Sequence, residues 1–283
     1  MNPLMIIIGA AVMAQMLAIG ANHTLGQLAS MPRHPRALLR YFLPVLVLFP
    51  AVVILLVYLF DLSPAIVTGL AILAAAPGAP MTTKRSEIAA ADLDFVSPLQ
   101  LTLALSAVVF TPLMLALFYA LFDLTIERVS PVAIARQVAM VTFLPVFIGL
   151  ALQKFAPGIA AKARKPINVI ANVLFLVMAG AVILAIAITP ELQQALVIGW
   201  PGTAVIAIMS VAAIALGHAF GGPGNRRRAG LATATLARNI GLAIFIAGMS
   251  EPGEVAVPTI LVFAAIGITF GVIYGIWIKR QPD

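Results

Sequence analysis

Residues 69–86 read Gly69-Leu-Ala-Ile-Leu-Ala-Ala-Ala-Pro-Gly-Ala-Pro-Met-Thr-Thr-Lys-Arg-Ser86, and this stretch decides the fold. An apolar run leads into two prolines three residues apart, and a polar segment follows them. Proline removes a backbone donor and clashes with the preceding helical turn, so the pattern predicts that one half-helix ends and another begins. The second half-helix would point its positive N-terminal end into the protein. The predicted break residues are Pro77, Gly78 and Pro80.

A second interrupted stretch lies in the other half of the chain, at Arg228-Ala-Gly-Leu-Ala-Thr-Ala-Thr-Leu-Ala-Arg-Asn-Ile-Gly-Leu-Ala243. Asn239 and Gly241 mark the predicted break, because asparagine can both donate and accept and glycine tolerates unwound backbone. Unwound backbone at membrane depth survives only around a cavity. Paired breaks in two halves of a chain therefore indicate the binding site of a transporter.

The composition is that of a polytopic helical membrane protein. Of 283 residues, 62% are hydrophobic and 10% are charged, and the mean hydropathy is +1.10. The chain has no cysteine, which excludes disulfides, thiol nucleophiles and thiolate metal sites. The net charge of +7 is explained by basic residues that flank membrane spans, so we expect no nucleic-acid partner.

Hydropathy predicts nine membrane spans of about 20 residues or more, joined by short links. They fall near residues 3–22, 38–60, 64–91, 95–122, 131–153, 166–188, 200–221, 226–250 and 255–278. We therefore expect a single transmembrane domain over residues 1–283 in the lipid bilayer of a bacterial inner membrane. The sequence does not define the oligomeric state.

The distribution of basic residues predicts the orientation. With the N-terminus outside and the C-terminus cytoplasmic, twelve of the seventeen Lys and Arg residues lie on the cytoplasmic side. The outer side holds only Arg128 and Arg136. The broken third and eighth spans then cross in opposite directions, as inverted repeats require. We predict a first repeat over residues 1–125, one helix short of five, and a second over residues 126–283.

Two basic residues within the broken spans need a reason to be there, because a charge at the bilayer centre costs about 2.5–3.5 kcal/mol. Lys84 and Arg238 would either bind an anionic substrate or replace the charge of a bound sodium ion. Arg238 can give a carboxylate two parallel hydrogen bonds, whereas Lys84 would act as a point charge. The alternatives are that Lys84 pairs with Glu87 or reaches the interface, and that Arg238 pairs with a structural carboxylate.

Further polar side chains near the breaks complete the predicted site. Thr82 and Thr83 can cap the new half-helix and offer hydroxyls, and Gln100 lies on the next span. The predicted substrate-binding residues are Arg238, Asn239, Thr82, Thr83, Lys84 and Gln100. We expect no catalytic residues and no enzyme activity, because no histidine, serine elbow or metal-ligand cluster accompanies the carboxylates.

Several of these segments resemble the bile acid:sodium symporter family. Residues 62–80 are similar to the first crossover helix of that family, and residues 238–243 are similar to its second crossover motif. Asp92 matches the acidic residue that ends the first motif, and residues 31–39 match a loop. The resemblance implies a panel of helices beside a core, two discontinuous helices that cross near the midplane, and secondary transport of an organic anion.

The positions that carry sodium ligands in that family differ in this chain. The resemblance aligns them with Thr82, Thr83, Ala234, Arg238, Val45, Val96 and Gln100. Sodium needs several oxygen ligands, so we expect no sodium site and no cofactor.

These observations predict a secondary active transporter that moves a small organic anion by alternating access. Transport would be uncoupled, proton-coupled or exchange-driven. Two alternatives stay open: a sodium-coupled symporter with ion sites built from backbone carbonyls, and a channel-like or structural membrane bundle.

Overall fold

The computed structural model describes residues 3–30, 35–122, 124, 130–249 and 253–281, and every regular element among them is helical. Eight helical segments in this part of the chain are long and apolar enough to cross a membrane: Pro3–Asn22, Arg36–Leu59, Leu93–Leu121, Pro131–Phe155, Pro157–Ile188, Gly199–Phe220, Asn225–Ala247 and Val257–Ile278. A shorter apolar helix, α5 (Pro64–Ala75), is followed after a break by α6 (Thr82–Ile88). This all-α polytopic fold confirms the predicted class and is compatible with nine spans.

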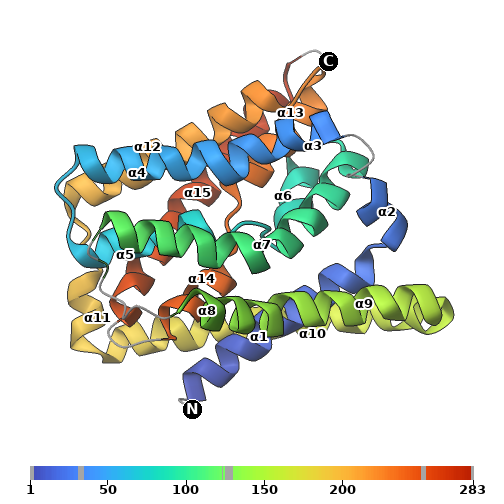
Figure 1. Ribbon diagram of the computed structural model, residues 1–283, viewed down its shortest axis with the longest axis horizontal. Coiled ribbons are helices and arrows are strands. Elements are labelled where there is room, and N and C mark those ends of the chain that lie inside the picture. Colours follow the sequence, from blue (N-terminus) through green and yellow to red (C-terminus); the bar gives the residue numbers. More distant parts are fainter. Residues whose placement is uncertain (1–2, 31–34, 123, 125–129, 250–252, 282–283) are drawn as a thin grey trace.

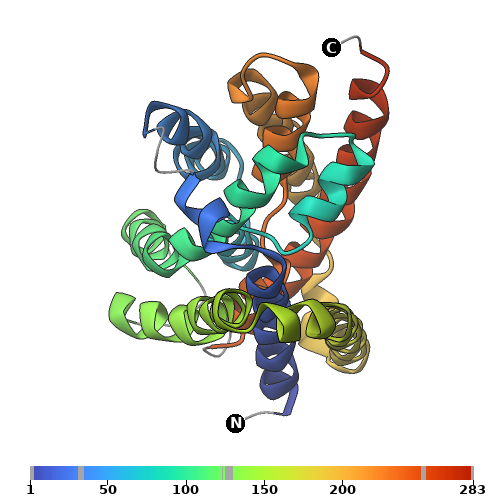
Figure 2. The same ribbon diagram turned by 90° about the vertical axis from the view of Figure 1, so that its right-hand side faces the viewer.

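The helices form two layers (Figure 1). One layer, which we call the panel, lies along the lower side of Figures 1 and 2. It contains α1 (Pro3–Asn22), α8 (Pro131–Val138), α9 (Leu144–Phe155) and α10 (Pro157–Ile188). The thicker layer, which we call the core, contains α3 (Pro35–Phe42), α4 (Phe49–Leu59), α5, α6, α7 (Leu93–Leu121), α12 (Gly199–Phe220), α13 (Asn225–Leu236), α14 (Ile240–Ala247) and α15 (Val257–Ile278).

The panel helices pack closely, with the backbone of α1 in contact with that of α9. A Cβ atom on Gly20 would overlap the backbone of α9 at Val146, so no larger side chain fits there. Gln15 Nε2 donates to Ala171 O at 2.8 Å, which joins α1 to α10. Gln153 Nε2 donates to Ala21 O at 2.6 Å, which joins α9 to α1. These contacts make α1, α9 and α10 one body.

One boundary differs from the sequence prediction, and two short helices were not predicted. The helix predicted over residues 166–188 begins at Pro157, because its first turns are basic and a hydropathy window detects only the apolar part. The short helices α2 (Leu25–Ser30) and α11 (Pro190–Ala195) were not predicted. The division into repeats at residue 125 stays a prediction.

The first break lies where the two prolines predicted it. Residues 76–81 are not helical, between the end of α5 and the start of α6. Gly78 has φ +75°, a left-handed conformation that glycine adopts without strain. A Cβ atom at this position would overlap the backbone of Ala104, so the break lies directly against α7.

The second break covers residues 237–239, between α13 and α14. Asn239 begins the new helix, because its Oδ1 accepts from Leu242 N at 3.1 Å. Gly241 was predicted as a break residue, but it is helical and lies in the first turn of α14. Since the asparagine cap starts the helix before this glycine, the unwound segment ends at Asn239.

The two broken segments cross in opposite directions. The first half-helix of one segment, α5, packs against the second half-helix of the other, α14, and α6 packs against α13. At the crossing, Asn239 N donates to Ala76 O at 2.9 Å. Thr111 Oγ1 on α7 donates to Ala75 O at 2.7 Å. Carbonyls at a helix end lack partners within the helix, so these bonds satisfy two of the last oxygens of α5.

Substitution Thr111→Val tests the contribution of the hydrogen bond between Thr111 and the end of α5. It keeps the side-chain shape and removes the donor to Ala75 O, which leaves a buried carbonyl unsatisfied. We expect a loss of about 1–2 kcal/mol, seen as a melting temperature lower by about 2–6 °C in detergent.

The matched control is Thr203→Val. The Thr203 hydroxyl is exposed and bonds Gly199 O of its own helix, so its removal should change stability by less than about 0.5 kcal/mol. Equal melting temperatures for the two variants would contradict the role given to Thr111.

Candidate functional site

The side chain of Arg238 closes the end of α5. In a regular helix Leu73 O would accept from residue 77, but that residue is proline and has no N–H. Arg238 Nε donates to Leu73 O at 2.9 Å, and Nη2 donates to Ala74 O at 2.6 Å. Ala76 N also donates to Leu73 O at 3.2 Å, so the guanidinium adds a second donor to Leu73 O and supplies one to Ala74 O.

A third carbonyl comes from the helical segment that precedes α4. Residues 43–48 form a π-helix, in which Phe49 N donates to Pro44 O. The next donor in this pattern would serve Val45 O from residue 50, which is again a proline. Arg238 Nη1 donates to Val45 O at 3.3 Å. Two prolines thus expose carbonyls toward one arginine.

The surroundings of Arg238 contain carbonyl oxygens and an aromatic ring. Its guanidinium lies 4.6 Å from the centre of the Phe49 ring, and the residue is 2% exposed. Within the described ranges, the one ion pair joins Arg227 and Asp92, near the start of α7. The predicted alternative in which Arg238 pairs with a carboxylate therefore has no counterpart among these residues.

The positions aligned with family sodium ligands do not form an oxygen cage. Val45, Val96 and Ala234 are buried and apolar. Thr82 Oγ1 donates to Ala79 O at 2.7 Å and belongs to the start of α6. Since Arg238 already fills the carbonyl oxygens at the end of α5, these residues do not fit a sodium ion.

Gln100 and Thr83 serve the first turn of α6. The Gln100 Oε1 accepts from Thr83 N at 3.2 Å and also from the Thr83 hydroxyl. Gln100 Nε2 donates to Pro80 O at 2.8 Å. These contacts join α6 to α7, and they leave the two side chains with few groups free for a ligand.

The second break presents unused donors. Asn239 is 2% exposed, and its Nδ2 has no hydrogen-bond partner among the described residues. The first two N–H groups of α14, on Ile240 and Gly241, likewise donate to no described residue. All three residues line a cavity of about 40 Å³ between panel and core. Arg238 lines the same cavity, which makes it a positive pocket at a helix N-terminus.

A larger crevice continues from this small cavity. Gln15, Pro80 and Met81 line both spaces, and the crevice measures about 340 Å³. Its core side includes Thr83, Lys84 and Gln100. Its panel side comes from α1 and α10. The breaks therefore lie at the inner end of a space that separates the two layers.

Lys84 reaches across this crevice. Its side chain is exposed, and Nζ donates to Asn172 Oδ1 on α10 at 3.4 Å. The alternative pairing with Glu87 does not occur, because no ion pair joins the two side chains, both of which are described. Lys84 thus places a positive charge in the crevice, where its hydrogen-bond acceptor is an amide oxygen and Glu87 also lines the wall.

The panel contributes polar residues that the sequence analysis missed. Asn168 and Asn172 line the crevice from α10, and Asn22 forms a reciprocal amide pair with Asn168 at 2.8 and 3.2 Å. Two asparagines four residues apart in an apolar span share one helix face, and that spacing could have identified them.

His23, next to Asn22, also lines the crevice. It is 5% exposed, and its Nδ1 lies 2.7 Å from Ile19 O. Burial lowers the pKa of His23 below its usual value. The ring is therefore neutral at neutral pH, with Nδ1 as the donor, because a carbonyl can only accept.

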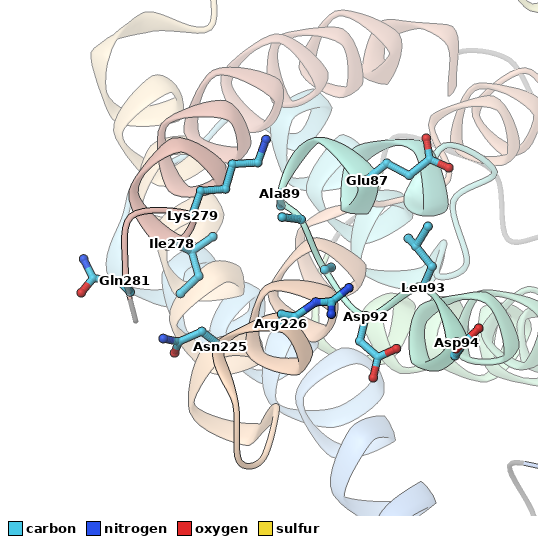
Figure 3. Close-up of a pocket in the computed structure, with 12 residues that line it drawn as sticks. Glu87, Ala89, Asp92, Leu93, Asp94, Asn225, Arg226, Ile278, Lys279 and Gln281 are labelled. Carbon is cyan, nitrogen blue, oxygen red and sulfur yellow. The ribbon is translucent and has the colours of Figure 1, made fainter. Parts of the chain in front are cut away.

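A third cavity, larger than the other two, lies away from the breaks. It measures about 660 Å³ between the end of α6, the start of α13 and the end of α15 (Figure 3). The labelled side chains include Glu87, Asp92 and Asp94 as well as Arg226 and Lys279, so charges of both signs line it. Neither break lines this space.

The structure brings most of the predicted site residues to two connected spaces. Arg238, Asn239 and Gly241 line the small cavity, whereas Thr83, Lys84 and Gln100 line the crevice. Pro80 lines both, and Thr82 lines neither. Pro77 and Gly78 line neither space, and Gly78 lies against α7.

Comparison with known proteins agrees with this arrangement. The model of the Sodium Bile acid symporter family matches residues 9–190, which is more than half of the chain. A search of curated proteins returned no match. The chain therefore belongs to the sodium bile acid symporter family.

Proposed function

We propose that this protein is a secondary transporter that carries a small organic anion by alternating access and does not convert it chemically. The observation that carries the proposal is the free Nδ2 of Asn239, buried at the N-terminus of α14 in a cavity between panel and core. A buried donor without a partner costs about 1–3 kcal/mol unless a ligand accepts from it.

The chemistry of the two spaces favours an anion with a polar body. The small cavity offers Asn239 Nδ2, two N–H groups and the positive end of α14. Its volume of about 40 Å³ has room for a carboxylate-sized group and not for a whole substrate. The crevice supplies Lys84 and several amides for the remainder. The anionic group would bind at Asn239, with the body directed toward Lys84.

Alternating access follows from the division into layers. The panel is one body, and the crevice separates it from the core over the crossing. Rocking one layer against the other would expose a fixed midplane site to each side in turn. The Lys84–Asn172 bond and the contact of His23 with the crevice wall would open and close in this motion.

The positive-inside rule gives the sidedness of the proposal. The N-terminus of α3, the junction of α9 and α10, the start of α13 and the end of α15 carry the basic residues. We place these ends in the cytoplasm and the N-terminus outside, in a bacterial inner membrane. The crevice, which lies by the C-terminal end of α1, would then open to the cytoplasm.

Substitution Asn239→Asp tests the anion site. The carboxylate keeps the oxygen that caps Leu242 N, removes the free donor and adds a negative charge. We expect the KM for uptake of the organic anion into proteoliposomes to rise at least about tenfold, equivalent to about 1.4 kcal/mol.

The control is Gln193→Glu, which makes the same chemical change on exposed α11 and should leave uptake unchanged. An unaltered KM in Asn239→Asp would overturn the assignment. Flux that rises linearly with substrate, without saturation, would favour the channel-like alternative over a carrier.

Substitution Lys84→Met tests the charge in the crevice. An exposed point charge contributes about 1 kcal/mol, so the affinity for the anion should fall about 3- to 10-fold. Lys162→Met removes an exposed charge from α10 outside the crevice and should have no effect. Glu87→Gln removes a negative charge from the same crevice and should not lower the affinity. A loss in Glu87→Gln equal to that in Lys84→Met would mean that the two residues act as a pair.

A further inference from the structure

We propose that the guanidinium of Arg238 occupies a cation site formed by the carbonyls of Val45, Leu73 and Ala74. The carrier would then supply its own counter-cation covalently and need no free metal ion. This inference deepens the proposed function, because it assigns the electrostatic partner of the anion site.

The three carbonyls have the character of a cation site. Leu73 O and Ala74 O belong to the last turn of a half-helix, where the partial charge is negative. Val45 O comes from a different segment and is freed by the π-helix and Pro50. Unwound carbonyls and half-helix C-termini are the groups that coordinate small cations in transporters with broken helices.

The positive charge has no other partner among the residues described. Each of the three guanidinium nitrogens donates to a carbonyl oxygen, the group lies over the ring of Phe49, and the residue is 2% exposed. A charged side chain within a membrane span pairs with another charged group or with backbone carbonyls, and Arg238 bonds to carbonyls. The guanidinium of Arg238 thus lies among backbone oxygens, in the position that a dehydrated cation would occupy.

The position of the charge connects it to the anion site. Arg238 directly precedes Asn239, and both residues line the small cavity. The cation therefore lies between the negative end of α5 and the positive end of α14. A bound anion would be attracted by the positive charge of Arg238, while the N–H groups of the guanidinium stay hydrogen-bonded to backbone carbonyls.

The first experiment removes the tethered cation and offers a free one. Arg238→Ala should melt about 5–10 °C below the wild type, because several buried carbonyls lose their donors. Methylguanidinium chloride should restore much of this loss, and sodium chloride less of it. Choline chloride, at the same concentration, is too large for the space and should restore none.

The control and a second variant keep the result interpretable. Arg85→Ala removes a charge from the same cavity whose side chain bonds to no described residue, so its melting temperature should be indifferent to the choice of cation. Arg238→Lys keeps a cation and should be more stable than Arg238→Gln. Equal stability of Arg238→Ala in methylguanidinium and choline would overturn the proposal.

The wild-type protein provides a test that needs no variant. Its melting temperature and its uptake of organic anion should be unchanged when choline replaces sodium. Stabilisation of the wild type by sodium, or uptake that requires sodium, would show that a free cation site exists and would overturn the inference. The melting experiments need no substrate, so they stand even if the wild type transports no organic anion, which would reject the proposed function alone.

Discussion

The structure depends on four carbonyl oxygens at the end of α5. In hydrocarbon each of these groups would cost several kcal/mol if left without a donor, and Pro77 prevents the helix from continuing to supply one. Donors from other segments reach all four: Arg238 for Leu73 and Ala74, Thr111 for Ala75, and Asn239 for Ala76, while Leu73 O also accepts from Ala76 N. The break in one span is stable because the break in another span lies against it.

The hydrogen bonds at the end of α5 also position the proposed anion site. The same two residues that close α5, Arg238 and Asn239, begin α14 and line the cavity beside it. In the proposal made above, a cation tethered at the crossing would keep the pocket positive through the whole transport cycle. Because that cation could not leave, no metal ion would need to cross with the substrate. The family resemblance supplies the architecture, and these two positions set the electrostatics of this member.

Much of the architecture could be predicted from local chemistry. Pro77 and Pro80 predicted the first break, and the position of Arg238 within the second broken span predicted that it lies inside the protein. Three roles were open for Arg238: ligand of the anion, replacement for a bound cation, and partner of a structural carboxylate. Its bonds to carbonyls support the role of a replacement cation. Gly241 was misplaced because glycine alone does not distinguish an unwound segment from the turn that follows an asparagine cap.

Contacts between distant elements could not be predicted in this way. Val45 O accepts from Arg238 only because a π-helix shifts the hydrogen-bond register by one residue before Pro50, and hydropathy carries no signal of that shift. The crevice could not be predicted either, because one of its walls is formed by α10, where Asn168 and Asn172 lie in an apolar span. Thr83 and Gln100 were predicted as ligand groups, but they bond to each other across α6 and α7.

Cross-linking tests the crossing most directly. The chain has no cysteine, so the introduced cysteines would be the only thiols that can react. Asn239 N lies 2.9 Å from Ala76 O, so the two backbones are within the reach of a disulfide, which spans Cα atoms about 4.4–6.8 Å apart. The account predicts that Ala76→Cys with Asn239→Cys forms a disulfide in membranes under mild oxidation, whereas each single variant does not. Two thiols that both remain open to alkylation after oxidation would contradict it.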